Sequence, residues 1–257
     1  MKRSLPSQQR FQFLIRPLCF IALVAGFLPC ALATSYDAVT DFSNSTNTNA
    51  STWSYRYKPG STVRDGVYTL LPGFTPTNGS WSPTNPGSWT VGGNVPEIGV
   101  NQTGTDVSYA VGPPFTWPKN TMLVHPGISD LVVLSWLSPV SSFFDIDFSF
   151  TDLDPNGGNG IAWFVERNSS LDTLSFGVFS NGGASTPQSL SNIFVNAGDR
   201  INFIVDPNGG YDYDSTKVTA TIRSVGSVPD TASSFELLSL ALFMMFGAKV
   251  LLGARLA

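Results

Sequence analysis

The sequence is short of cysteine, histidine and charged residues, and each shortage excludes a class of protein. Its two cysteines, Cys19 and Cys30, both fall in an N-terminal segment that we expect to be removed, so the mature chain has no disulfide, thiol nucleophile or cysteine metal site. Charged residues make up 12% of the chain, and its formal net charge is -4. Because little could neutralise phosphates, nucleic acid is excluded as a partner.

Groups suited to catalysis are also scarce. His125 is the only histidine, and its place before Pro126 and Gly127 favours a structural hydrogen bond in a turn over a role as a base. No Gly-x-Ser-x-Gly elbow occurs. Glycoside hydrolysis needs two carboxylates that flank one bond, whereas Glu97 and Glu166 are far apart in sequence and share no motif. We therefore expect no catalytic residues, and a polysaccharide-active enzyme is the least favoured interpretation.

The N-terminus has the three parts of a secretion signal. Lysine and arginine residues precede the apolar run 18–28, and the small-x-small triplet Ala31-Leu32-Ala33 follows it. This order predicts a signal peptide over residues 1–33, helical in its apolar part and cut by signal peptidase after Ala33. The run is shorter than the roughly 20 residues that span a bilayer, which disfavours the alternative of an uncleaved anchor.

A second apolar run lies near the C-terminus. It covers residues 237–248, is interrupted by Lys249, and is followed by Arg255. Because the basic residues come last, the positive-inside rule places the C-terminus in the cytoplasm and the preceding domain outside. We expect a transmembrane helix within residues 235–257. The run barely reaches across the hydrocarbon core, so a transient anchor fits better than a permanent one.

The segment ahead of this run carries a resemblance to a known family. Val228-Pro229-Asp230-Thr231, the small residues 232–234, the apolar helix and the late cations resemble a PEP-CTERM sorting signal. Asp230 stands where that family has a glutamate-type residue, and the terminal basic cluster is reduced to Lys249 and Arg255. The resemblance implies export to the surface or matrix of a Gram-negative bacterium and processing by an exosortase, often beside exopolysaccharide loci. An ordinary single-pass anchor is the alternative.

Residues 34–225 are predicted to form one all-β domain, joined to the tail by a linker at 226–234. Turn-forming residues interrupt the chain about every 8–12 residues, and no helical period is kept. In the clearest strand, 144–150, apolar side chains alternate with Asp145, Asp147 and Ser149, so one face is core and the other is solvated. Strands with one apolar face each predict a two-sheet antiparallel β-sandwich. Further strands are expected at residues 131–136, 161–165, 176–179, 201–205 and 218–222.

Five motifs of this domain, taken in order, resemble a recurrent extracellular β-sandwich module of environmental bacteria. That module is similar to jelly-roll carbohydrate-binding modules, which occur alone or beside polysaccharide-active enzymes. The resemblance implies a jelly-roll-like fold without naming a ligand, because jelly rolls host many functions. The motifs are Trp53-Ser54-Tyr55-Arg56-Tyr57, Leu123-Val124-His125-Pro126-Gly127, Leu134-Ser135-Trp136-Leu137-Ser138-Pro139, Asn196-Ala197-Gly198-Asp199-Arg200-Ile201-Asn202-Phe203 and Tyr213-Asp214-Ser215-Thr216.

Aromatic residues in loops rich in proline and glycine are the candidate ligand-binding residues. Flat aromatic faces can stack on sugar rings, and loops often carry function. The alternative is that these rings cap the sandwich, as large aromatics usually belong to the core, where we expect Trp53, Trp136 and Trp163. The candidates are Trp81, Trp89, Phe115 and Trp117.

Two acidic, glycine-containing loops between predicted strands are candidate calcium sites. Calcium takes 6–8 oxygen ligands, and glycine lets a short loop fold around the ion. The first loop is not an EF-hand, since Trp163 stands where the closing acid would be. The alternative is an ordinary turn whose side chains bond their own backbone. The candidates are Asp152, Asp154 and Asn156 in the first loop and Asp206, Asn208, Asp212 and Asp214 in the second, which we favour for its closer-spaced carboxylates.

Three functions are compatible with these features. The first is a non-catalytic exported surface or matrix protein that associates with extracellular polysaccharide. The second is a structural or adhesive module that meets protein partners through its loop aromatics, and an enzyme is the third. Signal peptidase and an exosortase would process the chain, and its C-terminal tail would contact the membrane. Structural calcium is the expected cofactor.

Overall fold

The computed structural model describes residues 33–76, 86–92, 94–109, 114–154 and 157–225. The expected signal peptide, the sorting motif at Val228-Pro229-Asp230 and the C-terminal transmembrane helix lie outside these ranges, as do Trp81 and Asn156. The described part of the chain holds no helix long and apolar enough to cross a membrane. Its one helical element is the single turn η1 (Ser170–Asp172).

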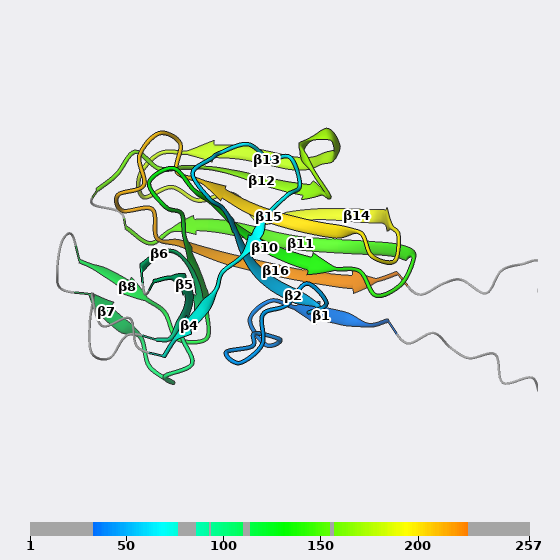
Figure 1. Ribbon diagram of the computed structural model, residues 1–257, viewed down its shortest axis with the longest axis horizontal. Coiled ribbons are helices and arrows are strands. Elements are labelled where there is room, and N and C mark those ends of the chain that lie inside the picture. Colours follow the sequence, from blue (N-terminus) through cyan, green and yellow to red (C-terminus); the bar gives the residue numbers. More distant parts are fainter. Residues whose placement is uncertain (1–32, 77–85, 93, 110–113, 155–156, 226–257) are drawn as a thin grey trace, which may run out of the picture. The chain divides into compact units, whose positions relative to one another are not determined.

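The described strands form two large antiparallel sheets and a small one (Figure 1). The eight-stranded sheet has the order β14-β11-β16-β9-β6-β5-β4, with β1 on β16, and the six-stranded sheet has the order β13-β12-β15-β10-β2-β3. In the first sheet the strands are β1 (Ser35–Asp37), β4 (Gly73–Thr75), β5 (Ser88–Val91), β6 (Asn94–Val100), β9 (Met122–His125), β11 (Ser142–Asp152), β14 (Gln188–Val195) and β16 (Thr216–Ser224). In the second they are β2 (Trp53–Lys58), β3 (Thr69–Leu70), β10 (Leu131–Leu137), β12 (Ile161–Arg167), β13 (Thr173–Phe179) and β15 (Arg200–Asp206). Strands β7 (Val107–Tyr109) and β8 (Phe115–Trp117) form the third sheet.

Strand β11 confirms the alternation predicted for residues 144–150. Phe144, Ile146, Phe148 and Phe150 are buried, while the intervening side chains are partly exposed on the other face. Period-2 alternation is what a strand with one dry face requires. The same pattern recurs in β16, its neighbour in the sheet.

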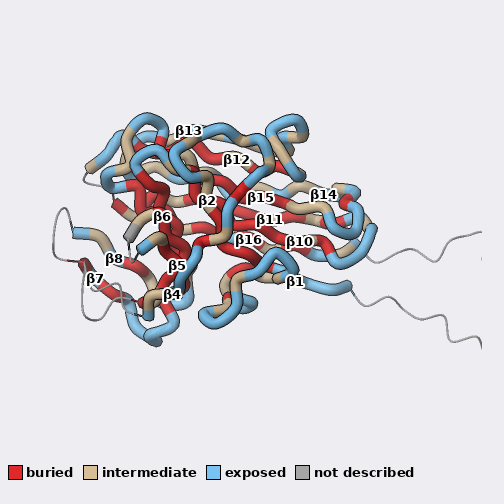
Figure 2. The backbone as a smooth tube through the Cα atoms, viewed as in Figure 1, coloured by how far each residue is buried: buried red, intermediate tan, exposed pale blue. Residues whose placement is uncertain are grey.

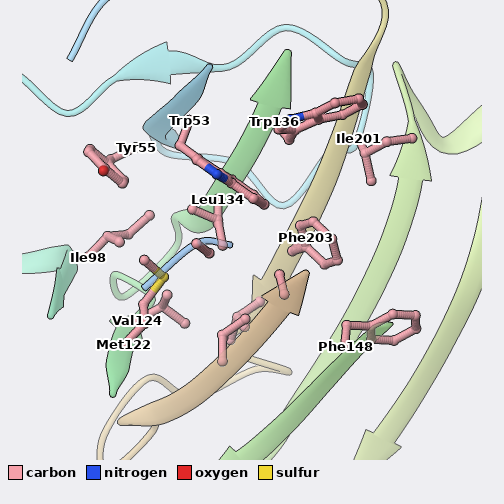
Figure 3. Close-up of a cluster of buried hydrophobic side chains, with 14 of the residues drawn as sticks. Trp53, Tyr55, Ile98, Met122, Val124, Leu134, Trp136, Phe148, Ile201 and Phe203 are labelled. Carbon is pink, nitrogen blue, oxygen red and sulfur yellow. The ribbon is translucent and has the colours of Figure 1, made fainter. Parts of the chain in front are cut away.

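The inner faces of the two large sheets meet through aromatic side chains (Figure 3). Trp136 of β10 packs edge-on against Phe144 of β11, with ring centroids 5.0 Å apart. Phe148 of β11 lies 5.8 Å from Trp163 of β12 and 6.0 Å from Phe203 of β15. One core therefore joins both layers, which confirms the predicted all-β, two-sheet antiparallel sandwich. The jelly-roll topology stays a prediction.

The described domain begins and ends at neighbouring points. Ser35 of β1 pairs with Arg223 of β16, and the amide of Thr34 donates to Ser224 Oγ at 2.8 Å. Both ends lie at the right of the sandwich in Figure 1. The strand pairings and the core of the described residues fall between these ends, so we expect residues 34–225 to fold without the rest of the chain.

A strap of residues 59–68, between β2 and β3, covers part of the outer face of the six-stranded sheet. Tyr68 packs there against a small apolar cluster on β10 and β15. Arg64 lies 3.5 Å from the centroid of the Phe164 ring and forms an ion pair with Glu166, whose side chain is fully buried. Burial raises the pKa of Glu166, and the guanidinium of Arg64 opposes that shift. The ion pair therefore fastens the strap over a carboxylate that would otherwise be buried alone.

Replacing Arg64→Met tests this fastening. The change leaves Glu166 buried without its cation, and we expect a loss of about 3 kcal/mol in the free energy of unfolding, the low end for breaking a buried ion pair. The double variant Arg64→Met with Glu166→Gln should recover part of the loss, because it removes the uncompensated charge. Urea unfolding followed by tryptophan fluorescence measures both, and an unchanged midpoint in the single variant would contradict the assignment.

Candidate functional site

The two acidic loops predicted from the sequence lie at the same end of the sandwich, opposite the chain ends (Figure 1). One loop leads from β11 to β12 and the other from β15 to β16, so each crosses from one large sheet to the other. Strand pairing brings them together, since Asp152 is the register partner of Thr216, and Asp206 that of Ala162. Residues 64 and 44 positions apart in sequence thus become neighbours.

Backbone hydrogen bonds join the two loops directly. The amide of Leu153 donates to the carbonyl of Ser215 at 2.8 Å, and the amide of Ser215 donates to Asp154 Oδ2 at 2.9 Å. Farther along, Asn159 Nδ2 donates to the carbonyl of Asn208 at 2.8 Å. The loops therefore form one structural unit, which sequence inspection treated as two.

Asp152 and Asp154 are buried within this unit, at 7% and 3% exposed. Backbone amides hold Asp152, since Asp154 N donates to its Oδ1 at 2.7 Å and Gly182 N to its Oδ2 at 2.6 Å. Burial raises the pKa of both carboxyl groups, although these hydrogen bonds and the nearby imidazole of His125 lower it in part. Two partly compensated acids therefore lie side by side.

Asp214 is the third buried acid, and it lacks such compensation. It is 1% exposed, and neither carboxylate oxygen has a hydrogen-bond partner. Burial, followed by the charges of Asp152, Asp154, Asp212 and Asp206, raises the pKa of Asp214 to about 8. Each of these causes acts in the same direction, because each disfavours the ionised form.

The remaining predicted calcium residues are placed differently. Asp206 is half-buried, and its Oδ1 accepts a hydrogen bond from Asn208 N at 2.9 Å, which is the self-bonded turn considered as the alternative. Asn208, in the left-handed backbone region at φ 50°, and Asp212 are exposed. The best-placed carboxylates therefore come from both loops rather than from the second alone. Within the described ranges, no three His, Cys, Asp or Glu side chains already converge as a metal site would.

The expectation that Trp89 and Trp117 present open faces to a ligand is wrong. They are 7% and 1% exposed, and their indole nitrogens donate to the carbonyls of Ser43 at 2.7 Å and Thr121 at 3.0 Å. Phe115 is half-buried and stacks on Tyr109 with ring centroids 4.4 Å apart. Trp89 belongs to the main core, whereas Trp117 and Phe115 pack in a separate apolar cluster with β7 and β9. The core positions predicted for Trp53, Trp136 and Trp163 are confirmed.

An exposed aromatic pair occurs instead on the outer face of the eight-stranded sheet. Phe143 of β11 and Phe194 of β14 are register partners, 46% and 42% exposed, with ring centroids 5.2 Å apart. We missed this pair in the sequence, although the doublet Phe143-Phe144 signals it. Successive strand residues point to opposite faces, so only one of the two can enter the core.

A polar row continues from this pair along β11, whose residues alternate between buried and half-buried (Figure 2). Asp145 Oδ1 accepts a hydrogen bond from Asn192 N at 2.8 Å. Asp147 accepts from Ser189 Oγ at 2.5 Å and forms an ion pair with Arg223. Ser149 follows, within hydrogen-bond distance of Thr219. We name Phe143, Phe194, Asp145, Asp147 and Ser149 the β11 strip.

The carboxylates considered for hydrolysis do not face each other. Glu97 lies in β6 of the eight-stranded sheet and accepts a hydrogen bond from Ser88 Oγ at 2.8 Å, whereas Glu166 lies in β12 of the other sheet. His125 is buried, with Nδ1 2.7 Å from the carbonyl oxygen of Pro126, as expected for a structural histidine. These residues therefore form no acid pair around a common bond.

The fold and these sites define an antiparallel β-sandwich domain with an open polar strip and an acidic loop pair. No family model and no curated protein matches the chain. A family 36 carbohydrate-binding module solved with calcium and xylotriose is 14% identical and aligns over 49% of this chain and 98% of its own, with a TM-score of 0.26. The K3 adhesin domain of Lys-gingipain from Porphyromonas gingivalis w83 is 13% identical and aligns over 40% of this chain and 71% of its own, with a TM-score of 0.28. Pika GITRL is 20% identical and aligns over 37% of this chain and 75% of its own, with a TM-score of 0.25. At these TM-scores the likenesses indicate no function.

Neutralising Asp214 should stabilise the domain when divalent cations are removed. Because the native pKa of Asp214, about 8, exceeds the ordinary aspartate value of 3.8, protonation favours folding, and this contribution is complete below pH 3.8 and lost as the pH rises through 8. In EDTA at pH 8.5, we expect Asp214→Asn to increase the free energy of unfolding by about 2 kcal/mol, which raises the unfolding midpoint by roughly 4–8 °C. The gain should shrink at pH 5. Thermal unfolding at both pH values measures it, and an equal gain at both would contradict the charge argument.

Proposed function

We propose that the chain is an exported, non-catalytic β-sandwich protein that associates with extracellular polysaccharide through its β11 strip. The observation that carries this proposal is the exposed ring pair Phe143 and Phe194, which adjoins a row of carboxylate and hydroxyl side chains. Apolar sugar faces stack on rings, and sugar hydroxyls need acceptors and donors beside them. The strip supplies both on a surface that the described chain leaves open.

Spacing along the strand supports a polymer as the ligand. Outward residues of β11 recur about every 6.6–6.8 Å, so an extended chain would meet a repeated set of polar groups. Asp147 and Arg223 already pair with each other, but both side chains are partly exposed. Exposed ion pairs contribute little, so sugar hydroxyls can compete for these groups at small cost.

The ends of the chain support a place at the cell surface. The secretion signal and the PEP-CTERM-like tail imply export from a Gram-negative-type bacterium, with signal peptidase and an exosortase as processing partners and brief membrane contact through the tail. Since both ends of the domain lie together, the tail would hold it by one end, with the acidic loops facing away. Calcium belongs to this proposal as a structural cofactor.

A structural or adhesive module that binds a protein partner is the second candidate. The observation that favours it is an apolar edge of the six-stranded sheet, where Leu171, Phe176 and Val178 are 97%, 70% and 65% exposed. Of the loop aromatics first considered for this role, Trp89 and Trp117 are buried and Phe115 is half-buried, so β13 and the adjoining η1 take their place. An enzyme has the least support, because no reacting pair was found among the described residues.

Polysaccharide binding is tested with residues 34–225 on a glycan array and by affinity electrophoresis. We expect retention by at least one neutral polysaccharide, and the double variant Phe143→Ala with Phe194→Ala should bind about tenfold more weakly or worse, a change of ~1.4 kcal/mol. Phe176→Ala is the matched control, since it removes an exposed ring from the other sheet. Loss of binding in that control, or no retained sugar, would refute the β11 strip, and cleaved sugar would indicate an enzyme.

Processing is tested by intact mass of the protein recovered from the surface or medium of an expressing host. We expect a mature chain that begins at Thr34, because cleavage follows the small residue Ala33. We also expect the tail to be removed near Val228-Pro229-Asp230. A mass that retains residues 237–257 would contradict tail removal and favour the single-pass anchor.

A further inference from the structure

We infer that the β11–β12 and β15–β16 loops together form a single calcium site, with Asp214 and Asp154 as ligands. The sequence alone suggested candidate calcium ligands within each loop separately, whereas this site takes its ligands from both loops. It refines the cofactor of the proposed function, but it does not rest on sugar binding, because no residue of the β11 strip takes part. The ion would be structural.

The unsatisfied carboxylate of Asp214 is the main observation. A buried polar group without a hydrogen bond is costly, and a buried charge without a partner is costlier still. Both carboxylate oxygens of Asp214 lack a hydrogen bond, and the negative charges of the buried Asp152 and Asp154 act on this group, so its ionised form is costly without a cation. The ion pairs found among the described residues involve other acids. A cation at this point would satisfy both free oxygens and neutralise the cluster.

The donor set selects calcium among the common cations. Carboxylate and carbonyl oxygens are hard ligands, and no cysteine is available in the mature domain for zinc or copper. Calcium accepts irregular arrangements of 6–8 oxygens, which suits two irregular loops, whereas magnesium demands near-octahedral geometry and keeps its waters.

Asp152 has a different role from Asp214 and Asp154. Both of its oxygens already accept backbone amides, from Asp154 and Gly182, so it positions the Asp154 loop and adds negative charge rather than binding the ion. One oxygen of Asp154 likewise holds the Ser215 amide. Because the carboxylates do not yet converge in the described structure, the ion must draw Asp214 and Asp154 together.

The backbones of the two loops approach each other closely at Gly158. Its backbone has φ +86°, and a Cβ atom there would lie 2.6 Å from the carbonyl oxygen of Asp212. Only glycine can occupy position 158, and this shows that the backbones of the two loops lie in contact beside the acidic residues. An ion bound here would tie together two connections between the sheets, and would stabilise the sandwich by mass action.

The test compares unfolding midpoints of residues 34–225 in calcium, magnesium and EDTA, with no sugar present. For the wild type we expect calcium at 100 times its dissociation constant to raise the midpoint by several degrees over EDTA, and magnesium to raise it less. Native mass spectrometry should show one bound calcium ion. Identical midpoints in calcium and EDTA would overturn the site, and an equal effect of magnesium would overturn its assignment to calcium.

Two variants and a control locate the ion. Asp214→Asn should unfold at or above the wild-type temperature in EDTA and lose the calcium response, a combination that simple structural damage would not produce. Asp154→Asn should also lose the calcium response, and it provides a second test of the site if Asp214→Asn folds poorly. Asp172→Asn is the control, because this acid pairs with Arg167 at the opposite end of β12, and it should keep the full response. A full calcium response in Asp214→Asn would overturn the proposal.

Failure of this site and failure of sugar binding can be told apart. The double variant Phe143→Ala with Phe194→Ala should keep the full calcium response, since these residues lie at the other end of β11. Loss of its calcium response would contradict the separation of the two sites. Calcium binding without any retained sugar would support the ion site and refute only the proposed function.

Discussion

Face-to-face contact of two antiparallel sheets through large aromatic side chains is the constraint on which the rest of the structure depends. Residues 34–225 contain no cysteine and so no disulfide, and burial of apolar surface must hold this domain together. Trp136, Phe148, Trp163 and Phe203 supply that surface from both layers. Each fully buried aromatic side chain contributes on the order of 2–3 kcal/mol, so the sandwich is stable only while the layers stay in contact.

This constraint explains where polar residues gather. A chain that builds two layers must cross between them, and it can do so only at the ends of strands, where backbone groups need other partners. At one end of the sandwich, two such crossings bring the loops that carry Asp152, Asp154 and Asp214 together. At the opposite end, the first and last described strands pair with each other. A cation at the crossings would compensate for a cost that the layered fold itself creates.

The outer faces of the two large sheets differ in which of their strands other segments cover. The strap with Arg64 and Tyr68 covers part of the six-stranded sheet, and the buried Glu166 is a consequence of that cover. The face of β11 is not covered in this way, and its Phe143 and Asp147 keep contact with solvent. An exposed aromatic pair beside charged groups therefore lies on the uncovered β11 part of the eight-stranded sheet, and it is the better candidate for a binding surface.

The sequence by itself determined the class of fold, the alternation of β11 and the core positions of Trp53, Trp136 and Trp163, because period-2 alternation and apolar burial are local properties of a strand. It also located both acidic loops. Only the tertiary structure decided that Trp89 and Trp117 are buried and that Phe143 packs against Phe194. It also decided that the loop of Asp214 lies against the loop of Asp152 and Asp154. These outcomes depend on strand order, which brings together residues distant in sequence and which no local pattern encodes.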